Sequence, residues 1–153
     1  MRRMDKQIND RNLIAEIINQ NSVCRIALAD EDKPYLVPMS YGFMDGKIYL
    51  HSAKEGQKID IIKKNNKVCF EISDSIEILG SGNACDFGLK YRSVIGFGRI
   101  SIVSDSHKKI EALKIIMRQH TGKTAWEFGE AVLNKVAVLK IQIDSLNGKI
   151  SGI

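Results

Sequence analysis

A strand that ends in a His-Ser pair and turns into a helix is the first place in this sequence where side chains could bind a ligand. The segment runs from Tyr49 to Lys58, and its turn contains Gly56. A helix start offers unpaired N–H groups and the positive end of the helix dipole. Ser52 can donate a hydroxyl hydrogen bond, and Lys58 adds a positive charge. The segment therefore predicts a pocket for an anion, most simply a phosphate group.

A second stretch, Tyr91 to Gly98, combines a planar cation, a hydroxyl group and two glycines. Arg92 can form paired hydrogen bonds to a phosphate or a carboxylate. Gly96 and Gly98 would allow a flat group to approach the backbone closely. Glycines also occur where a barrel strand bends, so an exposed arginine on such a strand is an equally good interpretation.

The elements that must position these residues follow from hydrophobic periodicity and turn signals. Asp45-Gly46 is typical of a two-residue hairpin, and Asp10 and either Asp105 or Ser106 would cap helices. Strands are predicted at 22–29, 35–43, 47–52, 68–72 with an irregular continuation through 76–79, 91–103 and 136–143, and helices at about 11–20, 55–64, 107–119 and 126–133.

The predicted strands are joined mostly by hairpins, which argues against a doubly wound parallel sheet. The predicted fold class is mainly β: a small antiparallel barrel of six strands with peripheral helices. We expect residues 1–153 to form a single domain with one core.

Composition narrows the classes of partner. The 153 residues carry 23 basic and 18 acidic side chains, a net charge of +5, without a basic stripe interleaved with aromatics. Nucleic-acid binding is therefore not expected. No apolar run approaches the ~20 residues of a membrane span, and no signal-peptide pattern is present. The three cysteines are far apart and form no Cys-x-x-Cys motif, which is typical of a reducing compartment. The sequence therefore predicts a cytoplasmic protein.

Motifs for several other chemistries are missing from the sequence. The histidines His51, His107 and His120 show no metal-ligand spacing with one another or with the cysteines. Nucleophile-elbow, Walker A and Rossmann glycine motifs are missing as well. The sequence therefore predicts no metal site and gives no indication of serine-hydrolase or nucleoside-triphosphate chemistry.

The combined pattern resembles the pyridoxamine 5′-phosphate oxidase-like flavoproteins, and within them the nitroimidazole-resistance (Nim-type) branch, over about residues 1–149. The resemblance implies an FMN-binding split β-barrel that works as a homodimer, with two flavins in clefts between the subunits. The segments that carry it are Val37-Pro38-Met39-Ser40-Tyr41-Gly42-Phe43, Asp45-Gly46-Lys47-Ile48-Tyr49-Leu50-His51-Ser52-Ala53, Gly56-Gln57-Lys58, Tyr91-Arg92-Ser93-Val94-Ile95-Gly96-Phe97-Gly98, Val136-Ala137-Val138-Leu139 and Gly148-Lys149.

The resemblance also implies which residues contact the flavin. One strand would lie beside the isoalloxazine ring and bond its polar edge through main-chain groups: Val37, Pro38, Met39, Ser40 and Tyr41. A second set would hold the ribityl phosphate: His51, Ser52, Ala53 and Lys58. A third set would approach the same flavin from the other subunit: Tyr91, Arg92, Ser93 and Val94. Trp126 and Phe128 would cover the ring or the substrate opening or, equally well, be buried in the core or at a dimer contact.

The function implied is reduction of a small electrophile, such as a nitroaromatic or nitroimidazole, with FMN carrying the electrons. His51 is the candidate catalytic residue, because histidine can donate a proton near neutral pH; a contact to the flavin phosphate or ring edge is its plainer role. The alternative function is a non-catalytic flavin-binding module for storage or sensing. A deazaflavin or haem could replace FMN. True pyridoxamine phosphate oxidation is not expected, because the C-terminus lacks that enzyme's Arg-rich segment.

Overall fold

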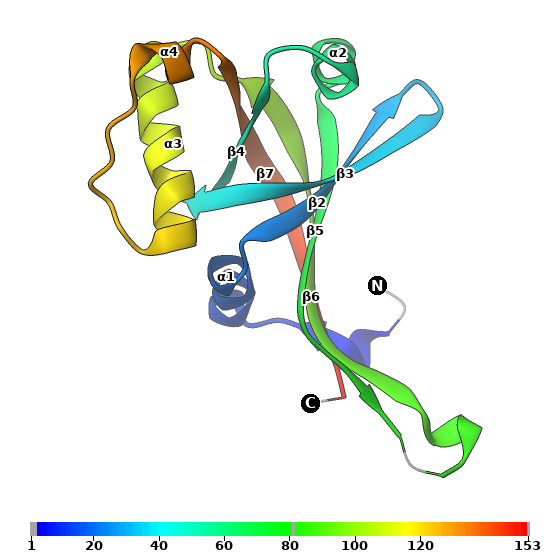
Figure 1. The fold of residues 1–153 in the computed structure, drawn as a ribbon. Coiled ribbons are helices and arrows are strands. Elements are labelled where there is room, and N and C mark those ends of the chain that lie inside the picture. The colour runs from blue at the N-terminus through cyan, green and yellow to red at the C-terminus, as the bar shows by residue number, and fades with distance from the viewer. Residues whose placement is uncertain (1–2, 81, 153) are drawn as a thin grey trace.

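An antiparallel sheet closes on itself to form a barrel in this protein (Figure 1). The computed structural model describes residues 3–80 and 82–152. Its strands are β1 (Gln7–Ile8), β2 (Val23–Asp30), β3 (Lys33–Met44), β4 (Lys47–Ala53), β5 (Lys67–Leu79), β6 (Gly88–Ile102) and β7 (Val136–Ser151). The strand order is β1-β7-β4-β3-β2-β5-β6, and β6 also pairs with β7. Six strands therefore form the closed wall, as predicted, and the two-residue β1 adds to the edge of β7.

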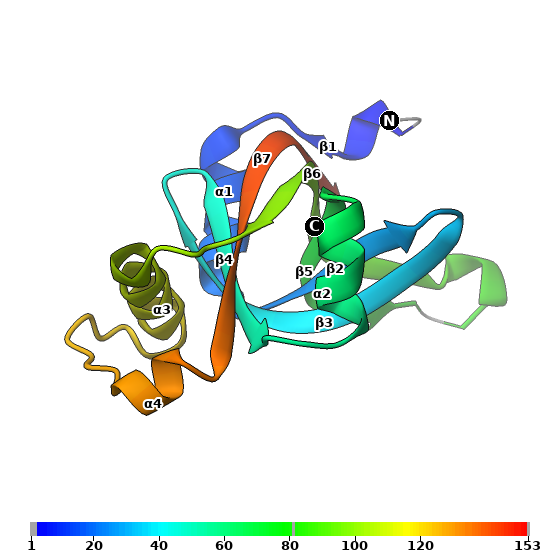
Figure 2. The ribbon, with the colours of Figure 1, turned by 90° about the horizontal axis from the view of Figure 1, so that it is seen from above.

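Helices cover the barrel from outside and at one end. They are α1 (Arg11–Gln20), α2 (Gln57–Lys64), α3 (Ser106–Thr121) and α4 (Glu130–Leu133), with short 3₁₀ turns η1 (Met4–Lys6) and η2 (Ala84–Asp86). The view along the barrel shows α2 over its end (Figure 2), where three isoleucines of α2 are buried in the core. Within the described residues, no helix is long and apolar enough to cross a membrane.

Two predicted helix caps are confirmed. The Asp10 carboxylate accepts a hydrogen bond from the Asn12 backbone N–H at 2.8 Å, and the Asp105 carboxylate does the same for Lys108 at 2.8 Å. Each bond satisfies a backbone donor that a helix start leaves unpaired. Asp105, rather than Ser106, is therefore the cap of α3.

The predicted helix around 126–133 is wrong over its first half. Only Glu130–Leu133 is helical, and the chain before it is an extended loop. The Trp126 indole N–H donates to the Lys123 carbonyl at 3.1 Å, and Phe128 packs against the hydrophobic cluster beneath α3. Partial burial of Phe128 and the indole hydrogen bond therefore outweigh the weak helix preference of this segment.

The outer face of β3 lies against α3. Met39 and Tyr41 point inward and are buried. On the opposite face, a Cβ on Gly42 would lie 2.6 Å from the backbone nitrogen of Ile116 in α3. Only glycine allows the helix to pack this closely on the strand.

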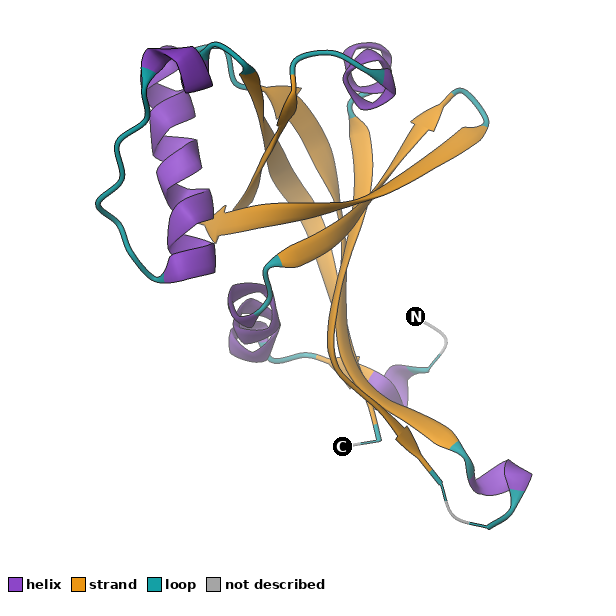
Figure 3. Ribbon diagram, in the orientation of Figure 1, coloured by secondary structure: helices purple, strands orange, loops and turns teal. Residues whose placement is uncertain are grey.

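The predicted irregular continuation of β5 through 76–79 is confirmed, whereas β7 runs well beyond its predicted range and β6 begins three residues early. The β5–β6 hairpin continues beyond the barrel (Figure 3), with a register shift between Asp74 and Glu77. The strand predicted at 136–143 extends to Ser151, because its polar second half pairs with β6 and β1. Pairing with neighbouring strands therefore sets the length of β7, and the polar sequence of its second half does not reveal that pairing.

The glycine pair in β6 has an internal role, and the suggestion that it admits a flat ligand is corrected. A Cβ on Gly96 would lie 2.1 Å from the ring of Phe70, and one on Gly98 would lie 2.2 Å from the Gln142 carbonyl oxygen. The β6–β7 register also shifts at Phe97/Gly98. The glycines make room for a core ring and for the neighbouring strand at a bend in the barrel.

Candidate functional site

The barrel wall opens between β3 and β4, beside the predicted anion pocket. The two strands pair from Met44 and Lys47 as far as Tyr41 and Leu50, and the pairing then stops. Beyond that point β3 remains paired only with β2 and β4 only with β7. The opening therefore leaves backbone groups of both strands without a strand partner.

Main-chain groups of Ser40 and Pro38 face this opening. The Tyr41 N–H donates to the Ser22 carbonyl on the β2 side. Backbone groups of successive residues point to opposite edges of a strand, so those of Ser40 and Pro38 point away from β2. Proline offers only its carbonyl. This edge thus presents two acceptors and one donor, the kind of pattern that could bond the polar edge of a planar ring.

The start of α2 has no side-chain cap, which leaves backbone donors that could bind an anion. Gly56 is the N-cap, with φ 112° and no capping side chain, and its carbonyl accepts from the N–H groups of Ile59 and Asp60. The N–H groups of Gln57 and Lys58 have no acceptor within the helix. Burial lowers the pKa of the Lys58 ammonium. A desolvated lysine beside free N–H groups fits a phosphate.

The remaining residues of the predicted phosphate set lie at the end of β4. His51 and Ala53 are exposed and Ser52 is half-buried. The Ser52 hydroxyl donates to the Ala53 carbonyl at 2.7 Å. The end of β4 and the start of α2 thus place the whole set together by chain continuity. Neither the cavity of about 480 Å³ beneath α3 nor that of about 540 Å³ beside α1 is lined by these residues.

Arg92 is already bound within the chain. Its guanidinium donates to Asp74 at 2.7 and 2.9 Å, to Glu16 at 2.9 Å and to Gln20 at 3.0 Å. Hydrogen bonding to Asp74 raises the pKa of Arg92. Four of the five guanidinium N–H groups are thereby used. Arg92 joins α1 to the β5–β6 hairpin, and its predicted contact with a ligand has one donor left.

The other members of the third predicted set differ in exposure. The Tyr91 ring lies 5.3 Å from the Lys149 ammonium, and Ser93 is half-buried. Val94 is fully buried, so its side chain belongs to the core. Only β7 lies between β6 and β4. Tyr91 pairs with Ser151 near the end of β7, whereas His51 of β4 pairs with Val138, near the start of β7. This distance along β7 keeps the set away from the β3–β4 opening within one chain.

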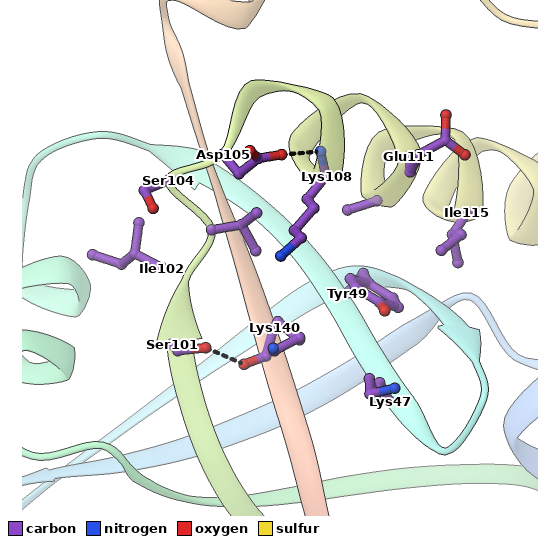
Figure 4. Close-up of a pocket in the computed structure, with 12 residues that line it drawn as sticks. Lys47, Tyr49, Ser101, Ile102, Ser104, Asp105, Lys108, Glu111, Ile115 and Lys140 are labelled. Carbon is purple, nitrogen blue, oxygen red and sulfur yellow. Dashed lines mark hydrogen bonds between the residues drawn. The ribbon is translucent and has the colours of Figure 1, made fainter.

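A cavity of about 480 Å³ lies between α3 and the outer face of the barrel, and sequence reasoning missed it (Figure 4). Its lining includes Lys47, Tyr49, Lys108 and Lys140. Burial, and to a lesser extent the charge of Asp45, raise the pKa of Tyr49. Three separate elements supply these residues, so no local motif could have indicated them. Among the described residues, no group of three or more His, Cys, Asp or Glu side chains could hold a metal ion.

A family model for pyridoxamine 5′-phosphate oxidase matches residues 10–150, nearly the whole chain. This chain belongs to the pyridoxamine 5′-phosphate oxidase family. The crystal structure of a candidate 5-nitroimidazole antibiotic resistance protein from Bacteroides thetaiotaomicron is 31% identical over 94% of this chain and 86% of that chain, with a TM-score of 0.84. The resemblance inferred from the motifs is thus confirmed.

More distant structures share the fold of this family member. The flavocytochrome Anf3 of Azotobacter vinelandii is 16% identical over 100% of this chain and 72% of that chain, with a TM-score of 0.84. An FAD- and haem-binding protein of Mycobacterium smegmatis is 16% identical over 97% and 74%, with a TM-score of 0.83. An uncharacterised protein of Rhizobium meliloti is 33% identical over 58 residues, and the match spans only 38% of each chain.

The Arg92–Asp74 pair generates a prediction about acid stability. Burial alone would raise the pKa of Asp74, but hydrogen bonds from Arg92, Asn21 and Ser75 hold it below its ordinary value. The charged pair therefore contributes stability above about pH 4, which is lost as the pH falls through the folded-state pKa. We expect Asp74→Asn to lower the free energy of unfolding by about 1.5–3 kcal/mol at neutral pH. Its stability should fall less than that of the wild type on acidification.

Urea denaturation at several pH values measures this difference. Asp144→Asn is the matched control, because Asp144 is exposed and lies 4.0 Å from Arg99. Parallel pH curves for Asp74→Asn and the wild type would contradict the assigned role of the pair.

Proposed function

We propose that this protein binds FMN at the β3–β4 opening and reduces a small electrophile, such as a nitroaromatic compound. One observation carries the proposal: an uncapped helix start follows β4, and β4 borders the opening at which the edge of β3 is unpaired. The start of α2 suits the phosphate, and the main chain of Ser40 and Pro38 suits the polar edge of a ring. Family membership supports the same cofactor.

The residues of this chain would hold the cofactor and control its surroundings. Lys58 and Ser52 would bind the phosphate, and the edge of β3 would orient the ring. When bound, FMN would supply the electron pair that reduces the substrate. His51 is exposed at the end of β4, where an imidazole nitrogen could deliver a proton to the substrate.

We further propose that the functional unit is a homodimer. A row of residues crosses four strands on the outer face: Leu36 pairs with Ala27, Ala27 with Cys69, and Cys69 with Phe97. Leu36 is 66% exposed and Phe97 51%. This apolar row begins on β3 at Leu36, two residues from Pro38 at the opening. A second copy of the chain packed on this row would border the cofactor. The Tyr91–Ser93 segment of that copy could then reach the flavin of the first copy, which it cannot do within one chain.

The phosphate assignment predicts the effect of one double substitution. Lys58→Ala with Ser52→Ala should weaken FMN binding, because each lost charge-assisted contact costs roughly 1.5–3 kcal/mol. Fluorescence titration of the apoprotein with FMN measures the change. Lys64→Ala, at the other end of α2 and paired with Asp30 at 3.2 Å, should bind FMN normally. Unchanged affinity in the double variant would mean that the phosphate lies elsewhere.

The dimer proposal predicts that Phe97→Glu yields monomers. A buried, unpaired carboxylate at the contact should separate the subunits, and FMN affinity should fall because the partner's contribution is lost. Sedimentation and FMN titration measure both effects. Val132→Glu, at a 52% exposed position on α4, is the control. A wild-type monomer that binds FMN fully would overturn this part of the proposal.

The reductase proposal predicts that a nitroimidazole reoxidises chemically reduced, FMN-loaded protein faster than anaerobic buffer does. Loss of a general acid should slow this step about 10²-fold or more in His51→Gln, with FMN affinity unchanged. If His51 only holds the cofactor, the variant will bind FMN less tightly and will react at the wild-type rate once it is saturated with FMN. If the nitroimidazole does not accelerate reoxidation of the wild-type protein, the reductase proposal is contradicted and the non-catalytic flavin-binding alternative is favoured.

A further inference from the structure

The cavity beneath α3 brings together three lysines that are far apart in the sequence. Lys47 lies on β4, Lys140 on β7 and Lys108 on the first turns of α3. Tyr49 pairs with Lys140, and Lys140 with Ser101, so these three side chains form a row on the outer face of the barrel. Figure 4 shows the Lys108 side chain extending from α3 toward Tyr49 and Lys140. The tertiary fold alone creates this cluster.

The acidic groups at the cavity rim are engaged elsewhere. The Asp105 carboxylate accepts from the Lys108 backbone N–H and caps α3. The Glu111 carboxylate pairs with Lys114 at 3.0 Å and points away from the cavity (Figure 4). In the described part of the chain, no carboxylate lies within 4.0 Å of the Lys47, Lys108 or Lys140 ammonium. The cavity therefore concentrates positive charge.

We propose that this cavity binds a small molecule through a diphosphate group. A volume of about 480 Å³ falls within the ~300–1,000 Å³ that ligand pockets span. Lysine is a compact charge that suits phosphate oxygens, and the Tyr49 and Ser101 hydroxyls can add hydrogen bonds. A single phosphate carries only about −1.5 to −2 charges at pH 7, so three ammonium groups match a diphosphate better. The bound anion would relieve their mutual repulsion.

This site is separate from the proposed FMN phosphate site and does not depend on it. Ser52 and Lys58 do not line the cavity. The start of α3 adds no free N–H through Lys108, because Asp105 already accepts that hydrogen bond. The lysine cluster and the cavity carry the inference together.

Isothermal titration of the full-length protein with inorganic pyrophosphate tests the proposal. We expect saturable binding that weakens by about tenfold for each ammonium removed in Lys108→Gln with Lys140→Gln. Lys114→Gln removes the same charge from the same helix outside the cavity and should bind pyrophosphate like the wild type. Lys58→Ala with Ser52→Ala should also leave this binding unchanged. Lys108→Glu alone, at an exposed position, tests the site if the double variant is unstable.

Three results would overturn the proposal. They are no saturable binding by the wild type, equal weakening in Lys114→Gln, or loss of binding only in the Lys58 and Ser52 variant, which would place the pyrophosphate at α2. A parallel titration with ADP identifies the source of the diphosphate. Tighter binding of ADP than of pyrophosphate would support a nucleotide ligand, and equal binding would support recognition of the diphosphate alone.

Discussion

The hydrogen-bond ladder between β3 and β4 stops at Tyr41 and Leu50, and the candidate site depends on this break. On the hairpin side of the break, the two strands are joined by the Asp45-Gly46 turn, in which both residues have positive φ. On the other side, Pro38 lacks an N–H and could not have continued a complete ladder. The strands separate, β4 leads into α2 through Gly56, and an unpaired edge comes to face an uncapped helix start. Sites of this kind need backbone groups that the fold itself leaves free.

The rest of the barrel holds this opening in place. Pairing of β6 with β7 closes the sheet, and Gly98 allows the bend at which their register shifts. Gly42 lets α3 pack on the outer face of β3, which fixes the paired part of the strand next to the break. Arg92 joins α1 to the β5–β6 hairpin through Asp74 and Glu16. These contacts and the hydrogen bond to Gln20 use four of the five guanidinium N–H donors of Arg92 within the chain.

Local signals in the sequence predicted much of this arrangement. Asp10 and the Asp105-Ser106 pair indicated two helix starts, and the Asp45-Gly46 turn indicated the hairpin that joins β3 to β4. The residues of the predicted anion pocket lie together because they are contiguous, from His51 to Lys58. Features that depend on distant residues were not predictable. The partners of Arg92 lie 18 and 76 residues away, the polar half of β7 is a strand only because β6 and β1 pair with it, and the three cavity lysines come from three elements.

The visible absorption spectrum of the purified protein tests the central claim most directly. The account predicts two flavin bands, with a cofactor that denaturation releases and that mass spectrometry identifies as FMN. A colourless protein that also fails to take up added FMN would contradict it. A haem Soret band in place of the flavin bands would also contradict the assigned cofactor and would require a different occupant for the opening.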